Sequence, residues 1–164
     1  MSENVAEILT QRARLLAQRQ PPQDEVASTF VWVRAYQENL LLDLKTLRRI
    51  EPSTAAVPLP LAPAGLRGLS YFRGEMVSVL DLGHILGLSQ PIENGFLIFT
   101  RTDPVVAFQV TEIRDLLTFT EAEHRPYQGT SLYYEALSPQ GYLFLNLSQV
   151  LQHPLIKRSL KESL

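Results

Sequence analysis

Short strand-like segments separated by turn signals are the feature that most constrains this fold. From Thr29 onward, β-branched and aromatic segments alternate with groups of Gly, Pro, Asn and Asp, at spacings of about eight to twelve residues. We expect strands over 29–36, 40–44, 69–72, 76–82, 96–100, 105–110, 132–137 and 142–147, and a strand or a bend over 113–119. Strands this short and this numerous are typical of one or two small barrels, not of a sandwich with long strands. The sequence therefore predicts a mainly all-β chain.

The connections between these strands are also predictable. Residues 73–75, Arg-Gly-Glu, predict a tight hairpin turn, because glycine tolerates the positive φ that such turns demand. The segment after the second strand predicts a short helical or bent edge, with Leu44, Leu47 and Ile50 on one side. Four prolines then predict an extended, turn-like connection: Pro52, Pro58, Pro60 and Pro63.

Helical patterns flank the β-rich part at both ends. Apolar residues recur every three or four positions over 5–16, and the prolines within 20–24 end this predicted helix. We therefore divide the chain into an N-terminal helical arm and linker, 1–23, and a domain over 24–164. At the other end, 147–164 predicts short helix, with Ser148 as its N-cap and Pro154 as a break or restart.

Composition excludes several classes of function. The 164 residues contain no cysteine, which excludes disulfides and thiolate chemistry and is compatible with a reducing compartment. With a net charge of −2 and scattered Lys and Arg, the chain lacks the basic stripe of a nucleic-acid binder. No window approaches the roughly 20 apolar residues that cross a bilayer, and residues 1–20 lack the apolar centre of a secretory signal. We expect a cytoplasmic protein without direct membrane insertion.

The sequence shows no converging set of catalytic or metal-binding residues. Asp81 and His84, three apart, could be two metal ligands, but no third is indicated, so we expect Asp81 to cap a short helix. Ser70 and Ser78 lack the context of a nucleophile elbow, and residues 65–68 lack the lysine of a phosphate loop. His124 and His153 stand alone among polar residues. We therefore expect no catalytic residue, no cofactor and no metal.

Three blocks of residues, in order along the chain, resemble the CheW domain of bacterial chemotaxis. The first is 44–50, Leu-Lys-Thr-Leu-Arg-Arg-Ile, ahead of the proline-rich connection. The second is 58–82, which contains the steps Leu66-Arg67-Gly68 and Tyr71-Phe72-Arg73-Gly74 and ends in Val77-Ser78-Val79-Leu80-Asp81-Leu82. The third is 141–147, similar to the closing strand of that family. One departure is Arg49, where the family frequently has an acidic residue.

The resemblance implies a fold and two partners. The fold is two intertwined five-stranded SH3-like barrels that share an apolar seam, with short helices at the N- and C-termini. The partners are the regulatory domain of a CheA-type histidine kinase and the cytoplasmic tip of a chemoreceptor, joined by a non-enzymatic adaptor. The receptor-facing residues would be Leu44, Leu47, Arg49 and Ile50, with Leu47 as an apolar anchor. Arg73, Gly74 and Asp81 would form a structural hairpin motif, with the Arg73 guanidinium forked onto carbonyls or a carboxylate.

A second hypothesis remains open beside the adaptor. Small barrels also bind nucleic acid, oligosaccharide or another protein, and this use needs exposed aromatic rings interleaved with basic residues. The candidate rings are Trp32, Tyr36, Tyr71 and Phe72, although basic residues around them are sparse in the sequence. For the core, the expected buried residues are Trp32, Leu42, Leu69, Val79 and Phe144.

Overall fold

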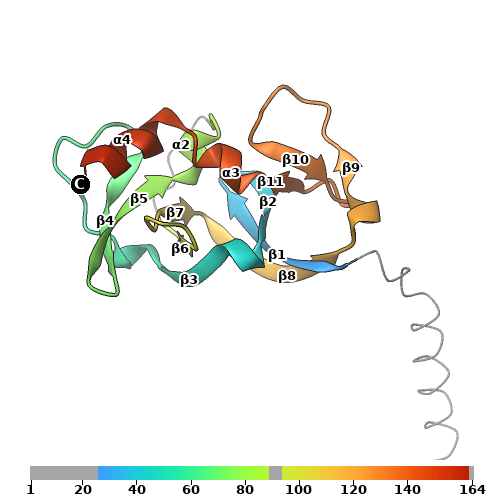
Figure 1. The fold of residues 1–164 in the computed structure, drawn as a ribbon, viewed down its shortest axis with the longest axis horizontal. Coiled ribbons are helices and arrows are strands. Elements are labelled where there is room, and N and C mark those ends of the chain that lie inside the picture. The colour runs from blue at the N-terminus through green and yellow to red at the C-terminus, as the bar shows by residue number, and fades with distance from the viewer. Residues whose placement is uncertain (1–25, 89–93, 163–164) are drawn as a thin grey trace, which may run out of the picture.

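Strands dominate the computed structural model, which describes residues 26–88 and 94–162. The expected helix over 5–16 and the linker over 20–24 lie outside the described residues. The strands form two sheets placed side by side, and three short helices run along one side of them (Figure 1). These helices are α2 (Leu82–Ile85), α3 (Leu147–Val150) and α4 (Pro154–Glu162).

The six-stranded sheet is built from both ends of the described chain. Its order is β8-β1-β2-β11-β10-β9, antiparallel except for the parallel pair β2–β11. The bounds are β1 (Ser28–Ala35), β2 (Glu38–Asp43), β8 (Glu112–Phe119), β9 (Arg125–Pro126), β10 (Tyr134–Leu137) and β11 (Leu143–Leu145). The two-residue strand β9 was not expected from the sequence. The 3₁₀ turn η3 (Glu121–Glu123) connects β8 to it.

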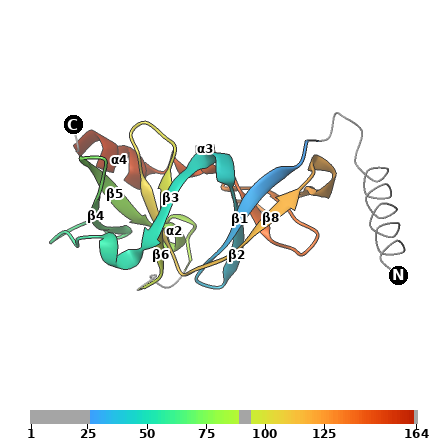
Figure 2. The ribbon, with the colours of Figure 1, turned by 90° about the horizontal axis from the view of Figure 1, so that it is seen from below.

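The five-stranded sheet is built from the middle of the chain. Its order is β3-β6-β7-β5-β4, antiparallel except for the parallel pair β5–β7. The bounds are β3 (Leu47–Pro52), β4 (Leu66–Phe72), β5 (Glu75–Asp81), β6 (Phe96–Thr100) and β7 (Ala107–Val110). Two 3₁₀ turns, η1 (Leu44–Thr46) and η2 (Ser53–Ala55), flank β3. In Figure 2 the chain passes from β2, in the six-stranded sheet, to β3, in the five-stranded sheet.

Both sheets curl around their own apolar interiors. In the five-stranded sheet, Val57 pairs with Leu69 of the edge strand β4, and the Ser70 hydroxyl donates to the Ala55 carbonyl at 3.0 Å. The segment that follows β3, one edge strand of this sheet, is thereby hydrogen-bonded to β4, the other edge strand. In the six-stranded sheet, the ring of Phe144 lies 4.9 Å from Phe30 and 5.3 Å from Phe119, which brings β11, β1 and β8 around one cluster.

Three hydrophobic clusters are formed by the described residues. One lies inside the six-stranded barrel around Phe30, Leu41 and Phe144, and one inside the five-stranded barrel around Val79 and Phe99. The third and largest is the seam between the barrels, to which β1, β2, β5, β6, β7 and the helices contribute. Along β1, Val31, Val33 and Ala35 face the seam, whereas Phe30 faces the barrel interior. Strand β1 therefore packs on both of its faces. The expected architecture of two intertwined small barrels with a shared apolar seam is confirmed, with six strands in one sheet where five were expected.

The predicted core is right for three residues of five. Leu42, Val79 and Phe144 are buried, whereas Trp32 and Leu69 are half-buried. Trp32 lies at the edge of its cluster, with its ring stacked on Tyr142 and its Nε1–H donating to Asn39 Oδ1 at 3.0 Å. On β4 the buried positions are Gly68, Ser70 and Phe72, so Leu69 has the opposite phase to the one expected.

The phase of β4 has a steric cause. Gly68 lies so close to the Val57 carbonyl that a side chain there would collide with it, so the glycine takes the inward position. A second correction concerns α3, whose N-cap is Asn146, not Ser148. The Asn146 side chain accepts from the Gln149 N–H at 3.2 Å.

Candidate partner-binding surface

The segment 44–50 is held in place by local hydrogen bonds. Asp43 caps η1 by accepting the Lys45 N–H at 3.0 Å, and the Thr46 hydroxyl donates to the Asp43 carbonyl at 2.6 Å. β3 then pairs with β6, with an irregular register between Leu47 and Arg49. Such an irregularity redirects side chains along a strand. Arg48 and Arg49 are both exposed as a result.

The predicted receptor-facing residues divide into two groups. Leu44 is 42% exposed and Ile50 is 39% exposed, and Arg49 is exposed beside its ion-pair partner Glu51. Leu47 is only 4% exposed, because its side chain belongs to the seam between the barrels. A residue so buried supports the surface from beneath and cannot anchor a partner, so the expected anchor role of Leu47 is corrected. The accessible apolar side chains of the segment are Leu44 and Ile50.

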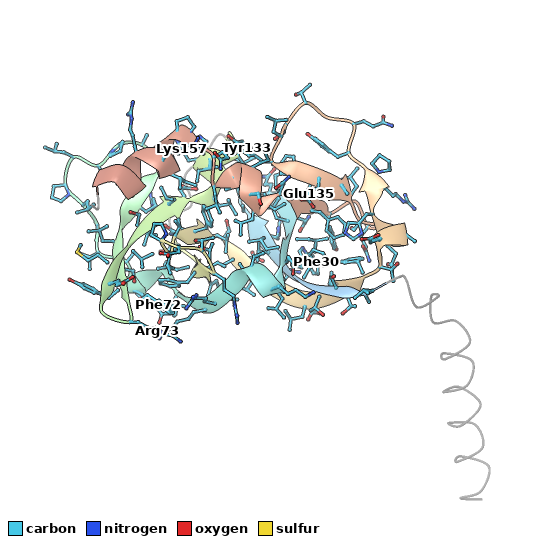
Figure 3. All side chains as sticks on the ribbon, in the orientation of Figure 1. Phe30, Phe72, Arg73, Tyr133, Glu135 and Lys157 are labelled. Atoms are coloured by element: carbon cyan, nitrogen blue, oxygen red, sulfur yellow. The ribbon has the colours of Figure 1, made fainter. Side chains whose placement is uncertain are left out.

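The segment lies between two hollows. One, of about 510 Å³, is lined by Arg48, Arg49, Phe72, Arg73 and Arg101; we call it the arginine hollow. The other, of about 420 Å³, opens at the end of the six-stranded barrel, where Asp43, Lys45 and Thr46 meet Phe30 and Glu135. Figure 3 shows Phe72 and Arg73 together in one barrel and Phe30 and Glu135 in the other. Segment 44–50 therefore contributes to a surface on each barrel.

The predicted hairpin motif takes its expected conformation. Arg73 and Gly74 have φ of 51° and 81°, as a turn with two central residues of positive φ requires, and they join β4 to β5. The Arg73 guanidinium carbon lies 5.2 Å from the centre of the Phe72 ring, where we had expected a fork onto carbonyls or a carboxylate. Asp81 caps α2 as predicted, accepting the His84 N–H at 3.1 Å.

Sequence reasoning missed two members of the arginine hollow, Arg48 and Arg101. Arg48 lies on β3 and Phe72 on β4, at opposite edges of the sheet, yet the Arg48 guanidinium carbon is 5.7 Å from the centre of the Phe72 ring. Arg101 donates from Nε to the Leu47 carbonyl at 2.9 Å. Nothing in the local sequence could bring them together, because the three regions involved are separated by whole strands and meet only when the barrel closes.

Among the described residues, the pKa is shifted for two ionisable side chains, Tyr134 and His153. No group of three or more His, Asp or Glu side chains within 26–88 and 94–162 could hold a metal ion. Burial, aided by the charge of Glu38, raises the pKa of Tyr134 to about 12, so its hydroxyl stays protonated and is no general base. Burial lowers the pKa of His153, and the nearby His84 lowers it further by a smaller amount. The Nδ1 atom of His153 accepts a hydrogen bond from the Leu155 N–H at 3.1 Å.

Two candidate stacking rings of the alternative hypothesis are already covered within the chain. Tyr142 stacks on Trp32 with ring centres 4.6 Å apart, and Arg114 lies over the same ring. Phe72 is buried beneath two arginines. A covered ring offers no free face to a base or sugar. The geometry thus disfavours a stacking platform for nucleic acid or oligosaccharide at these two rings.

Two small barrels with a shared apolar seam place the chain in the class of small double-barrel proteins. The CheW-like domain family model matches residues 29–154, and the chain belongs to this family. It is therefore a non-enzymatic coupling adaptor of chemotaxis signalling. No helix in the described part of the chain is long and apolar enough to span a bilayer.

Individual relatives agree with this assignment. The chain is 25% identical over 113 residues to the chemotaxis protein CheW of Rhizobium meliloti (strain 1021), an alignment that covers 67% of this chain and 73% of the relative. Its fold is similar to the crystal structure of the scaffolding protein TtCheW from Thermoanaerobacter tengcongensis. That comparison has a TM-score of 0.67 and 14% identity, and covers 77% of this chain and 94% of the other.

Proposed function

We propose that this chain works in the cytoplasm and joins the cytoplasmic tip of a chemoreceptor to the regulatory domain of a CheA-type histidine kinase. The observation that carries the proposal is the presence of exposed apolar side chains on two different elements, segment 44–50 and the β4–β5 hairpin, on either side of the arginine hollow. An adaptor needs one surface for each partner, and each must expose apolar side chains that become buried on binding.

The first surface is segment 44–50, which we assign to the receptor tip. Leu44 and Ile50 supply apolar area, Arg49 supplies charge, and Leu47 fixes the segment to the seam. A helical hairpin that lies along this segment would contact the hollows on either side of it. An exposed apolar strip between hollows suits an amphipathic helix, which inserts its apolar face into a groove.

The second surface is the β4–β5 hairpin, which we assign to the kinase domain. Tyr71 and Met76 are cross-strand partners and are 66% and 55% exposed. Aromatic and Met side chains are enriched at protein interfaces. The Arg73-Gly74 turn fixes the end of this hairpin, so its apolar pair is presented on a rigid support.

The test is a pair of titrations of the full chain, one with the receptor tip and one with the kinase regulatory domain. Leu44→Asp should weaken receptor binding at least tenfold and leave kinase binding unchanged, because a charge enters one desolvated patch only. Met76→Asp should do the reverse, so each variant is the matched control for the other. Circular dichroism confirms folding. Binding of neither domain by the parent chain would overturn the proposal, and equal losses for both domains in both variants would remove the two-surface assignment.

A further inference from the structure

Four exposed arginines meet around one buried aromatic ring in the arginine hollow. Arg48 and Arg49 come from β3, Arg73 from the β4–β5 turn and Arg101 from the end of β6, and all four are exposed. The whole chain carries 15 Lys and Arg against 17 Asp and Glu. The hollow is therefore locally positive on a chain whose net charge is −2.

The chain itself compensates only part of this charge. The ion pairs formed by the described residues are Arg49–Glu51 and Arg114–Glu112. Within those residues, then, Arg48, Arg73 and Arg101 have no carboxylate partner. Guanidinium groups stay protonated at any physiological pH, so the four repel one another. A bound anion would relieve this repulsion.

The arginines are arranged before any partner binds. Arg48 and Arg73 rest over Phe72, at 5.7 Å and 5.2 Å from the ring centre, and Phe72 in turn stacks on Phe99 at 5.8 Å. A cation over a ring face is held by electrostatic attraction, which does not consume its N–H donors. Those donors remain available for a carboxylate, which arginine binds through two parallel hydrogen bonds.

The surroundings favour a carboxylate from a protein over other anions. Small-molecule sites are lined mainly by apolar and aromatic groups, whereas this lining is four arginines and one ring. A nucleic-acid strand needs basic residues that follow its backbone over an extended path. Here four arginines surround a single hollow, and one of them, Arg49, is ion-paired with Glu51. A short acidic segment of a protein is compact enough for one hollow and supplies the carboxylates that arginine binds.

We infer that the arginine hollow receives an acidic patch of the protein that docks on segment 44–50, with at least two Asp or Glu side chains of the partner paired to Arg48 and Arg73. This rests on the proposed function, because Arg48 and Arg49 belong to the segment assigned to the receptor; it adds that the same partner also contacts Arg73 at the tip of the β4–β5 hairpin, while Tyr71 and Met76 remain assigned to the kinase. It adds the chemistry of the partner: carboxylates beside apolar residues on one helix face. Charge complementarity of this kind selects among partners more than it raises affinity.

The test uses the ¹⁵N-labelled full chain and three probes. They are a helical peptide with glutamates at i and i+4 beside leucines, the same peptide with glutamines, and a single-stranded oligothymidylate. The glutamate peptide should shift the Nε–H resonances of Arg48 and Arg73. The glutamine peptide and the oligonucleotide should bind at least tenfold more weakly. Arg48→Glu and the milder Arg48→Gln should both weaken the glutamate peptide, with folding confirmed by thermal melting.

Arg114→Glu is the matched control, because Arg114 also lies over an aromatic ring but on the other sheet, and it should leave binding unchanged. Equal affinity for the glutamate and glutamine peptides would overturn the inference, and so would tighter binding of the oligonucleotide. If the glutamate peptide fails while receptor and kinase domains still bind, the inference falls and the proposed function stands. If the peptide binds and neither domain does, the proposed function falls and the acid-binding hollow stands.

Discussion

The Arg48 guanidinium carbon lies 5.7 Å from the centre of the Phe72 ring, although β3 and β4, which carry these residues, are opposite edges of the five-stranded sheet. The two edges meet because the sheet closes, through the Val57–Leu69 bridge and the bond from Ser70 to Ala55. The arginine hollow is thus assembled at the closure of the barrel. Its geometry depends on the packing of Phe72 in the cluster beneath it.

Leu47→Ala should destabilise the fold, whereas Leu44→Ala should not. Leu47 is 4% exposed within the seam, so its truncation should reduce the free energy of unfolding by about 2–5 kcal/mol. Leu44 is 42% exposed, and its truncation should change that energy by less than about 0.5 kcal/mol. Urea unfolding followed by Trp32 fluorescence measures both. Similar small losses at the two sites would mean that the segment does not pack as described.

Leu42→Ala and Leu69→Ala form a second pair that tests strand phase. Leu42 is 2% exposed in the seam and should lose about 2–5 kcal/mol of unfolding free energy. Leu69 is half-buried on the outer side of β4 and should lose about 1 kcal/mol. The same unfolding assay applies. A greater loss at Leu69 than at Leu42 would reverse the assigned phase of β4.

The Gly74 position tests the conformational demand of the hairpin turn. Gly74 has a φ of 81°, and no atom lies within 4 Å of where a Cβ would be. Gly74→Ala should therefore cost about 1 kcal/mol of stability through backbone strain alone. Gly74→Asn should cost less, because Asn tolerates this region of φ better. Thermal melting of the two variants decides it, and an equal or greater loss for Asn would point to crowding instead of strain.

His153 should make the stability of the fold fall in mild acid. Its pKa is lowered in the folded chain by burial and then by His84, so below the unfolded value of about 6.5 the unfolded chain binds more protons. Protonation of Nδ1 would also remove the hydrogen bond that it accepts from the Leu155 N–H at the start of α4. The His153 ring lies beside the ring of Tyr133. The free energy of unfolding should decrease as pH falls through about 6.5.

The control for this pH effect is His153→Asn, which keeps a capping side chain without a titrating ring. Denaturant unfolding at about pH 7.5 and about pH 5.5 is compared for the parent and the variant. The parent should lose more stability than the variant over this interval. Equal losses would show that other groups carry the dependence.

The local elements of this fold were predictable from the sequence, and the contacts between distant elements were not. The hairpins over 96–110 and 132–147 follow from alternating apolar residues around Pro- and Gly-containing turns. The parallel pairs β2–β11 and β5–β7 join strands far apart in the chain, so no local pattern indicates them. The same holds for the arginine hollow, whose members are brought together by barrel closure.

His124 illustrates the same limit at one residue. In the sequence it stands among polar neighbours and indicates nothing. In the fold its ring stacks on Phe144 with centres 3.9 Å apart, and its Nδ1 lies 2.8 Å from the Thr120 carbonyl oxygen. The polar neighbours belong to η3, a single turn outside the barrel, while the ring reaches inward. The residues next to His124 in the sequence therefore indicate an exposed turn, but they do not indicate that its ring packs on Phe144.

The path of the chain through the two barrels has a mechanical consequence. The chain begins one sheet with β1 and β2, builds the whole of the other from β3 to β7, and then returns to complete the first. The chain therefore cannot be divided at one peptide bond into two separate barrels. The seam between the barrels is the largest apolar cluster of the described residues. The shared strands and the common seam both oppose movement of one barrel relative to the other. Two proteins attached to different barrels would be held at a fixed mutual angle, and a displacement of one would be passed on as a displacement of the other.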